Sequence, residues 1–557
     1  MSTILTLHDP QVARRYYAQG FWREDTLYTL LRSHAQARPD AFALRDSRRR
    51  LTWRALLQWV DVVAADLHAE GVKRGQRVSV RLPNSVEAAI VLLACSRNGY
   101  VCNPSLHQTY SAAEVVTLME RIQSAVLFTQ SGYGADAAND VSVAALALPS
   151  IKCVYRVGAP AGEDAAHGKH RDFPQLETRV EPPRAAASDD NPDKIVYLAF
   201  TSGTTGLPKG VLHSDNTLLA NGRAMVRDWH HDERTVLYSH SPLSHHIGTV
   251  AMEQSLVAGC ELVVNDVPAG MKPLDWILET GATYVMGVPT HAMDILADMK
   301  QRGTEKLGEV TVFYMAGSTI PPATARAFLD MGVKPQNVYG MSENGSHQYT
   351  LPGDDTETIT ATCGKACAGY ETRLWDPENP DREATRGEVG EIGTRGALLM
   401  LGYFDNQTAT ESSFNAHGWF MSGDLGRFDV SGNLQIVGRK KDLIIRGGHN
   451  IHPATIENLA LRHPRVLKAA AYPVSDARLG ERVCLAVIPR DEPGIVPTEL
   501  LEHLASAGLS KYDMPEYFIE MDRFPLTASG KILKRELIEW TRSGRITPDA
   551  VRWAKKS

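Results

Sequence analysis

The chain has 557 residues, enough for a large hydrophobic core and for more than one domain. Hydrophobic residues make up 43% of it and the net charge is −6, which argues against a nucleic-acid binder that depends on bulk positive charge. Its seven cysteines show no spacing typical of a disulfide scaffold or a zinc finger, so we interpret them as free thiols.

Two features of the sequence bear on where the protein works. Residues 1–17 lack the long apolar core of a signal peptide. The longest apolar stretch, residues 88–95, is far too short to span a bilayer. We therefore expect a soluble cytoplasmic protein, without membrane insertion and without a nucleic-acid partner.

Residues 20–150 alternate between helical and strand-like patterns. Helices are predicted at Leu27–Ala37 and at Val86–Asn98, the second with Asn84 or Ser85 as its N-terminal cap and Gly99 at its end. Short strands are predicted at 42–45, 51–52, 78–82 and 126–129, the first two as a hairpin. This alternation predicts a layered α/β domain. Residues 158–193 lack periodicity, and we interpret them as a surface excursion.

A second apolar run, residues 195–200, predicts a buried strand, and Thr-Ser-Gly-Thr-Thr-Gly-Leu-Pro-Lys-Gly follows it at 201–210. The glycines allow close backbone approach to a ligand, the hydroxyls supply donors, and Lys209 supplies a positive charge. Such a loop suits a polyphosphate. It is not a Walker A loop, because Pro208 precedes the lysine and Gly210 follows it.

These ten residues resemble, position for position, the phosphate-binding loop of the acyl-adenylate-forming (ANL) superfamily. That superfamily includes acyl-CoA synthetases, adenylation enzymes that load carrier proteins, and firefly luciferase. The resemblance implies that Thr205 is catalytic and helps to bind Mg²⁺. It also implies that ATP binds through the loop residues Thr201, Ser202, Gly203, Thr204, Thr205, Gly206 and Lys209.

Five histidines cluster in the sequence between residues 230 and 246. A metal site is an alternative here, but no carboxylate or cysteine completes a recognisable ligand set, so we favour ordinary surface or core histidines. The resemblance places His245, and His246 as its neighbour, in the acyl pocket.

Strands predicted at 283–290 and 310–315 precede further candidate residues. Small residues at 316–319 follow the second strand, at the end where parallel α/β sheets bind ligands, although a plain strand–helix turn fits them equally well. The resemblance implies that Gly317 and Ser318 flank the adenine and that Gly317 also borders the acyl pocket.

Residues 337–343 read Asn-Val-Tyr-Gly-Met-Ser-Glu. Tyr339 offers a flat face for adenine, Ser342 a hydroxyl for the α-phosphate, and Glu343 a hard oxygen ligand for Mg²⁺. The motif is similar to the family's Tyr-Gly-x-Ser/Thr-Glu. The resemblance adds Asn337, Gly340 and Met341 to the nucleotide site and Gly345 and Ser346 to the acyl pocket.

Residues 388–404 resemble a further family block, to which we assign no chemistry. Asp424, between two glycines, can accept hydrogen bonds from both ribose hydroxyls. The resemblance matches Arg439 to an arginine that contacts ribose and phosphate, and Lys441 to the hinge about which the small domain turns.

The rest of the chain alternates short strands and helices and predicts a small mobile α+β domain. We divide the chain into domains 1–440 and 441–557. By resemblance, the predicted loop with Gly447, Gly448 and His449 approaches coenzyme A, and Lys531 completes the adenylation site. Leu479 replaces a tryptophan that contacts coenzyme A in one relative, which leaves the CoA nucleotide site open.

Taken together, the motifs imply a ligase that uses ATP, Mg²⁺ and coenzyme A to convert a carboxylic acid to its acyl-adenylate and then to acyl-CoA. The sequence most resembles bacterial cyclohexanecarboxylate–CoA ligases, and without a basic residue for a second carboxylate we expect a monoacid with an apolar body. The alternatives are an aryl acid–AMP ligase that loads a carrier protein and a medium-chain fatty acid–CoA ligase. A luciferase-like oxygenase shares the same adenylation residues, whereas a non-catalytic nucleotide sensor would lack Glu343 or Lys531. The turn around Lys531 also resembles a target of lysine acetyltransferases.

Overall fold

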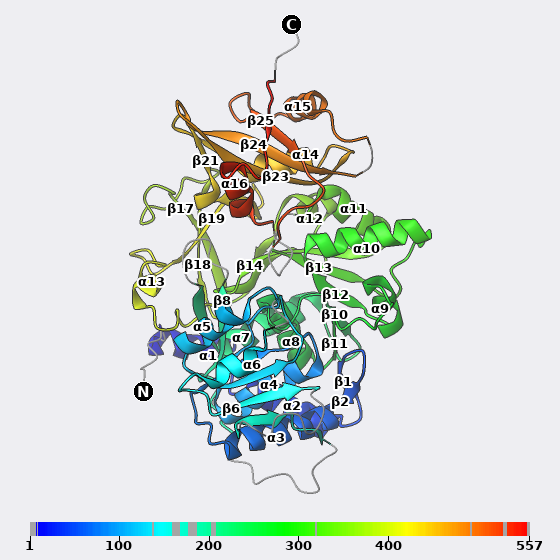
Figure 1. Cartoon of the computed structure of the whole chain (residues 1–557), viewed down its shortest axis with the longest axis vertical. Coiled ribbons are helices and arrows are strands. Elements are labelled where there is room, and N and C mark those ends of the chain that lie inside the picture. Colours follow the sequence, from blue (N-terminus) through cyan, green and yellow to red (C-terminus); the bar gives the residue numbers. More distant parts are fainter. Residues whose placement is uncertain are drawn as a thin grey trace.

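The computed structural model describes residues 7, 9–135, 139–158, 168–176, 187–201, 208–317, 320–490, 493–526 and 532–553. Figure 1 shows a large N-terminal part and, at one end of the long axis, a small C-terminal part in orange and red. None of the helices in these ranges combines the length and apolarity that a membrane crossing needs. All seven cysteines are buried free thiols, as the sequence predicts.

The first sheet of the large part has seven strands in the order β7-β6-β5-β3-β4-β8-β9. All neighbours are parallel except β8 and β9, which form an antiparallel pair. The strands are β3 (Arg77–Arg81), β4 (Val101–Asn103), β5 (Ser124–Gln130), β6 (Cys153–Val157), β7 (His170–Asp172), β8 (Ile195–Thr201) and β9 (Lys209–Ser214). β7 corrects the prediction of an irregular excursion over 158–193: its polar residues give no strand pattern, and only its pairing with β6 makes it a strand.

The second sheet has nine strands in the order β16-β15-β14-β13-β12-β10-β11-β1-β2. The strands are β1 (Phe42–Arg45), β2 (Arg50–Thr52), β10 (Val236–Ser239), β11 (Glu261–Val264), β12 (Tyr284–Gly287), β13 (Val312–Ala316), β14 (Lys334–Met341), β15 (Gly345–Tyr349) and β16 (Lys365–Ala366). The predicted hairpin of β1 and β2 is confirmed. The strand predicted over 283–290 was too long, because Pro289 begins a helix.

Helices cover and separate these sheets. They are α1 (Pro10–Ala18), α2 (Leu27–Ala37), α3 (Trp53–Ala69), α4 (Val86–Asn98), α5 (Ala112–Arg121), α6 (Val141–Leu146), α7 (Asp215–Trp229), α8 (His246–Ala258), α9 (Pro273–Thr280), α10 (Pro289–Arg302), α11 (Pro322–Asp330), α12 (Thr356–Ala361) and α13 (Gln407–Glu411). α7 contacts β8 and β9 of the first sheet and β15 of the second, while α8 contacts β10, β11, β12 and β15. Both helices are therefore buried between the sheets, and α8 is buried on all sides.

α4 confirms the predicted bounds but corrects the predicted cap. Ser85 occupies the N-cap position, yet its hydroxyl makes no capping bond and is buried without a partner. Asn84 instead accepts a hydrogen bond from the backbone N–H of Leu243, at 3.3 Å. The first helical N–H, that of Val86, lies 3.4 Å from Oδ2 of Asp46, so a carboxylate from another segment replaces the local cap.

The third sheet is antiparallel and links the two parts of the molecule. It consists of β17 (Tyr370–Trp375), β18 (Gly390–Gly396), β19 (Phe420–Phe428) and β20 (Leu434–Arg439), in that order. A short 3-10 helix, η2 (Lys440–Asp442), follows β20 directly and leads into the C-terminal part.

The C-terminal part has its own sheet and its own hydrophobic core. Its elements are β21 (Ile444–Arg446), β22 (His449–Ile451), α14 (Pro453–Ala460), β23 (Val466–Asp476), β24 (Gly480–Pro489), α15 (Pro497–Ser506), β25 (Tyr517–Glu520), α16 (Lys534–Arg542) and β26 (Asp549–Ala550). The predicted α+β arrangement is confirmed. The loop predicted at 447–450 is shorter than expected. Gly447 and Gly448, with φ of 59° and 86°, form a two-residue hairpin turn, and His449 already belongs to β22.

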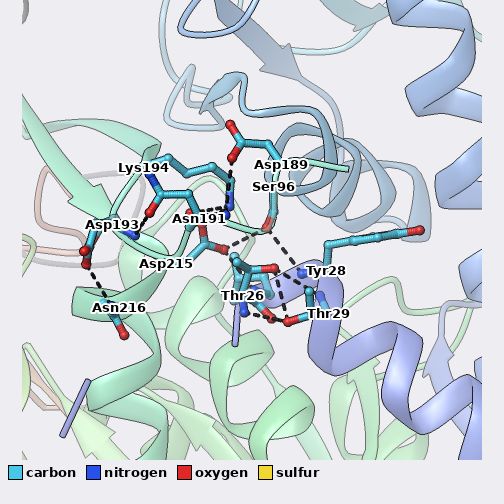
Figure 2. A network of polar contacts seen from close by, with 12 residues as sticks. Thr26, Tyr28, Thr29, Ser96, Asp189, Asn191, Asp193, Lys194, Asp215 and Asn216 are labelled. Atoms are coloured by element: carbon cyan, nitrogen blue, oxygen red, sulfur yellow. Dashed lines mark hydrogen bonds and ion pairs between the residues drawn. The ribbon is translucent and has the colours of Figure 1, made fainter. Parts of the chain in front are cut away.

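A buried ion pair closes the base of the β8–β9 hairpin (Figure 2). Nζ of Lys194 lies 2.7 Å from Oδ2 of Asp215, and both side chains are buried. Oδ1 of Asp215 accepts hydrogen bonds from the backbone N–H of Leu27, at 2.9 Å, and from the hydroxyl of Ser96, at 2.7 Å. The pair therefore joins the hairpin to α2 and α4, at the end opposite the predicted phosphate loop.

Candidate active site

The predicted phosphate loop connects β8 to β9. Thr201 and Lys209 face each other across the last pair of this antiparallel ladder, so the two ends of the loop are held together. Residues 202–207 lie outside the described residues. The predicted contacts of Ser202, Gly203, Thr204, Thr205 and Gly206 with nucleotide and metal therefore stay predictions.

Lys209 and Glu343 meet at the ring of Tyr403. Nζ of Lys209 lies 4.5 Å from the centroid of the Tyr403 ring, a cation–π contact. The Tyr403 hydroxyl donates a 2.9 Å hydrogen bond to Oε1 of Glu343. The backbone N–H of Met400 donates to the carbonyl oxygen of Glu343, at 2.7 Å. The structure thus brings together the end of the phosphate loop and the carboxylate predicted to bind Mg²⁺, from segments far apart in the sequence.

The environment of Glu343 shifts its pKa. Burial raises the pKa of this carboxyl, while the hydrogen bond from Tyr403 and the charge of Lys209 lower it. The charge of Asp424 also raises it. A cation bound at Glu343 would favour the ionised carboxylate, as a divalent metal ligand requires.

Tyr339, Asp424 and Arg439 form a second cluster, where β14 of the nine-stranded sheet meets the antiparallel sheet. The Tyr339 hydroxyl donates a 2.9 Å hydrogen bond to Oδ2 of Asp424. Nε of Arg439 lies 3.3 Å from Oδ1 of the same carboxylate, because residues 424 and 439 are paired across β19 and β20. The cluster thus places both predicted ribose ligands at the end of β14.

The predicted acyl-pocket residues Gly345 and Ser346 begin β15 beside α7. The side chain of Asn221 accepts from the backbone N–H of Ser346, at 2.8 Å, and donates to its carbonyl, at 3.1 Å. The hydroxyl of Ser346 lies 2.8 Å from that of Tyr314. Gly345 has φ of 60°, and a Cβ there would lie only 2.5 Å from Oδ1 of Asn221, so a larger residue does not fit.

His245 and His246 stand at the start of α8. The ring of His246 stacks on that of His213, with centroids 5.5 Å apart. Nε2 of His213 lies 2.7 Å from the carbonyl oxygen of Ser342, and burial lowers the pKa of His213 to about 4. His245 lies 6.1 Å from the ring of His107. Within the described ranges, no group of three or more metal-binding side chains is present. His246 is buried and His245 is half-buried.

The remaining residues predicted for the nucleotide site lie in β14 or directly after β13. Gly317 follows β13 with φ of 92°, and Ser318 lies outside the described residues. The amide of Asn337 donates to the carbonyl of Ile359, at 3.1 Å. Gly340 packs so closely on the backbone of β15 that a Cβ would lie 1.9 Å from the carbonyl oxygen of Gly345. The backbone N–H of Met341 donates to Asn344, at 3.0 Å.

Between the two parts of the molecule, the predicted hinge residue Lys441 lies in η2. Burial is the largest cause that lowers the pKa of Lys441, and the charge of Arg439 lowers it further. The neighbouring Lys440 donates a 3.0 Å hydrogen bond to Glu391, which also accepts from the backbone N–H of Gly423, at 3.2 Å. These bonds anchor the start of η2 to the antiparallel sheet.

The residues predicted to meet coenzyme A lie on the small part. The backbone N–H of Gly447 donates to the carbonyl of Leu479, at 2.7 Å, and His449 lies 2.8 Å from Asp513. Lys531 is outside the described residues. Leu526 and Ile532 on either side of that segment are bridged, which holds its two ends together.

Three residues that hold the site together were not predicted from the sequence: Tyr403, His213 and Asn221. Tyr403 carried a usable signal, because it lies in the Gly-Tyr pair that ends the family block to which we assigned no chemistry. His213 and Asn221 carried none, because His213 lies in β9 and Asn221 lies in α7, and packing alone explains the residue pattern of both elements.

Two family profiles match the sequence of the chain. The profile described as AMP-binding enzyme matches residues 31–404, and that of the AMP-binding enzyme C-terminal domain matches residues 455–531. The chain therefore belongs to the family of AMP-binding, adenylate-forming enzymes, and it is an AMP-forming acid–thiol ligase of the acyl-CoA synthetase type with the predicted ANL fold.

Individual relatives are distant. The chain is 29% identical to the medium-chain fatty-acid–CoA ligase of Escherichia coli strain K12, over 96% of this chain and 93% of that one. It is 30% identical to the 2-hydroxy-7-methoxy-5-methyl-1-naphthoate–CoA ligase of Streptomyces carzinostaticus, over 94% and 95% of the two chains. The solved structure of ATP-bound MatB from Rhodopseudomonas palustris matches with a TM-score of 0.80 and 26% identity, over 94% of this chain and 100% of that one.

Proposed function

We propose that this chain is an ATP-dependent acid–CoA ligase whose substrate is an alicyclic monocarboxylic acid such as cyclohexanecarboxylate. In the first step the carboxylate of the acid attacks the α-phosphate of ATP and pyrophosphate leaves. In the second step the thiol of coenzyme A attacks the acyl carbon of the acyl-adenylate and AMP leaves. The binding of ATP and coenzyme A by similar ligases supports the choice of co-substrates.

The observation that carries the proposal is the Lys209–Tyr403–Glu343 contact. It places a cation and a carboxylate at the end of the loop that would cradle the phosphates. Two anions must meet in the first step, and Lys209 and the predicted Lys531 would offset their charge. Glu343, with Thr205 as predicted second ligand, offers the hard oxygens that Mg²⁺ prefers. When bound, the metal would neutralise phosphate charge.

The nucleoside end of ATP fits the second cluster. Oδ1 and Oδ2 of Asp424 are held by Arg439 and Tyr339, so the carboxylate is oriented before a ribose arrives. We infer that its remaining acceptor positions bind the ribose hydroxyls and that the Tyr339 ring packs on adenine. The same proposal includes four further assignments. They are the hinge at Lys441, the domain boundary between residues 440 and 441, the coenzyme A contacts of Gly447, Gly448 and His449, and the cytoplasmic location.

A panel of acids tests the function. AMP release would be measured with and without coenzyme A for cyclohexanecarboxylate, benzoate, octanoate, 2,3-dihydroxybenzoate and palmitate. We expect CoA-dependent turnover with the highest kcat/KM for the alicyclic acid, and weaker turnover of its neighbours, because each methylene changes discrimination by about 1–3 kcal/mol.

Other outcomes would contradict part or all of the proposal. A preference for palmitate or octanoate would make the chain a fatty acid–CoA ligase. Adenylation of the aryl acid without CoA-dependent release would favour the carrier-protein-loading alternative. Absence of AMP formation with every acid would overturn the proposed function.

A further inference from the structure

Glu253 is a buried carboxyl for which the described protein provides no hydrogen-bond partner. It lies on α8 between the two sheets, with 0% of its surface exposed. Among the residues that the structure describes, neither Oε1 nor Oε2 has a hydrogen-bond partner. An unpaired polar group in such a place is costly, and native proteins keep few of them. Such a cost is typical of groups that are retained for function.

Two buried tyrosines, Tyr197 and Tyr314, interact electrostatically with this carboxyl, and the hydroxyl of each is engaged elsewhere. The hydroxyl of Thr249 donates to that of Tyr197, at 3.3 Å. The hydroxyl of Tyr314 lies 2.8 Å from that of Ser346, a predicted acyl-pocket residue. The charge of Glu253 contributes to the raised pKa of both tyrosines. Both tyrosine hydroxyls therefore have partners other than Glu253, and the carboxyl stays unpaired among the described residues.

Glu253 stands on the same face of α8 as His246. The spacing of His246, Thr249 and Glu253 by three and then four residues puts them in one line along the helix. The rise from His246 to Glu253 is about 10 Å, and helical side chains lean back toward the N-terminus, so the carboxyl lies over the turn of Thr249. His246 lies at the end of this line that is nearer to Ser342, the residue predicted to bind the α-phosphate. His246 stacks on His213, and His213 contacts the carbonyl oxygen of Ser342.

We propose that Glu253 is a specificity-determining residue at the far end of the acyl pocket, and that the preferred acid carries a hydroxyl group on the ring carbon opposite its carboxylate. This inference rests on the proposed function and names its substrate class more closely. Burial raises the pKa of Glu253 well above its usual range and so favours the protonated carboxyl. A protonated carboxyl both donates and accepts, as a hydroxyl does, and the two groups complement each other. Tyr197, Thr249, Tyr314 and Ser346 carry no positive charge that would favour a second carboxylate.

A matched pair of acids tests the inference. We would measure kcat/KM for trans-4-hydroxycyclohexanecarboxylate and for cyclohexanecarboxylate with the wild-type enzyme, Glu253→Gln and Glu253→Leu. The wild type should prefer the hydroxy acid by about 10- to 100-fold, because an acid without the hydroxyl leaves a buried polar group unpaired. Glu253→Leu should abolish or reverse this preference, while Glu253→Gln, whose amide also donates and accepts, should keep most of it.

Gln254→Leu is the control, since Gln254 is an equally buried neighbour on α8 that donates instead to Val250 and Met286. Gln254→Leu should change kcat/KM for the two acids by the same factor. Glu253→Leu replaces a buried, unpaired carboxyl with an apolar group. Its thermal unfolding should therefore occur at a temperature equal to or higher than that of the wild type.

If the ratio of kcat/KM for the hydroxy acid to kcat/KM for the unsubstituted acid were the same in the wild type and in Glu253→Leu, the inference would be overturned. AMP formation would in that case still support the ligase activity. If Glu253→Leu does not fold, a wild-type enzyme that prefers the unsubstituted acid, or that does not discriminate between the two acids, overturns the inference instead. Absence of AMP formation with every acid tested would overturn both proposals together.

Discussion

The hydroxyl of Tyr403 and the carboxylate of Glu343 are joined by a 2.9 Å hydrogen bond, and the ring of the same tyrosine lies under the ammonium group of Lys209. One side chain thus orients both charged groups that we place around the phosphates. Because Tyr403 is buried and its own hydroxyl is satisfied by Glu343, the carboxylate is held in one position before ligands bind.

The first prediction concerns the charge of Glu343. Glu343→Gln keeps the shape of the side chain and removes the charge that we expect to hold Mg²⁺, so pyrophosphate release should fall by at least about 10²-fold. Circular dichroism should show a folded protein. Glu371→Gln is the control, because Glu371 is an exposed carboxylate paired with Arg395 at the surface. Near-normal pyrophosphate release by Glu343→Gln at ordinary Mg²⁺ concentration would make the metal assignment wrong.

The second prediction concerns pH. The hydrogen bond from Tyr403 lowers the pKa of Glu343, so Tyr403→Phe should raise that pKa. Since Glu343 must be ionised to bind a cation, activity is lost as the pH falls through its pKa, and the acidic limb of kcat/KM for ATP should move to higher pH. The measurement requires limiting Mg²⁺, because excess metal competes with the proton.

Phenylalanine retains the ring beneath Lys209, so the cation–π contact serves as an internal control. An acidic limb that stays in place or moves to lower pH would contradict the role that we give to Tyr403.

The third prediction concerns the ribose. Asp424→Asn removes the charge that pairs with Arg439 and weakens acceptance of hydroxyl donors, so KM for ATP should rise by about tenfold or more. The wild type should discriminate against 2′-deoxy-ATP, whereas Asp424→Asn should discriminate less. If the two enzymes showed the same ratio of kcat/KM for ATP and 2′-deoxy-ATP, Asp424 would not be the ribose ligand.

The fourth prediction concerns the buried pair of Lys194 and Asp215. Lys194→Met leaves the carboxylate buried beside Leu27 and Ser96 without its cation, which should lower the free energy of unfolding by about 3–5 kcal/mol. Asp215→Asn added to Lys194→Met should recover part of the loss, as urea unfolding can measure. The exposed pair of Arg395 and Glu371 should contribute under about 1 kcal/mol by the same method. Equal losses at the two pairs would contradict this account.

The fifth prediction concerns the alternation of the two domains. Lys531→Ala should slow adenylation by about 10²–10³-fold, because it removes a positive charge where two anions meet, and leave thioester formation from ready-made acyl-adenylate near the wild-type rate. Acetylation of Lys531 should have the same effect. Lys441→Pro should slow thioester formation and leave adenylation near the wild-type rate. Proline locks φ in η2 and so blocks a second orientation of the C-terminal domain. Rates of both half-reactions decide the matter, and equal slowing of both steps by Lys531→Ala would contradict domain alternation.

Local physical signals in the sequence predicted a large part of the fold. The period of apolar residues and the flanking Gly99 placed α4 at its observed bounds, and the turn between two short apolar runs predicted the hairpin of β1 and β2. Both features depend on residues that are neighbours in the chain. The ligase family also followed from short motifs, because each contains several groups of one site in consecutive positions.

Only the tertiary structure decided which distant groups meet. Strand order in both large sheets differs from chain order, so the sequence could not place Lys209 beside Tyr403 and Glu343, or Tyr339 beside Asp424. β7 has no strand pattern, and α4 takes its cap from Asp46, because pairing and hydrogen bonds from other segments override local preference there. Whether the carboxyl of Glu253 in α8 finds a partner depends on the side chains that other elements bring to it, and among the described residues none bonds to it.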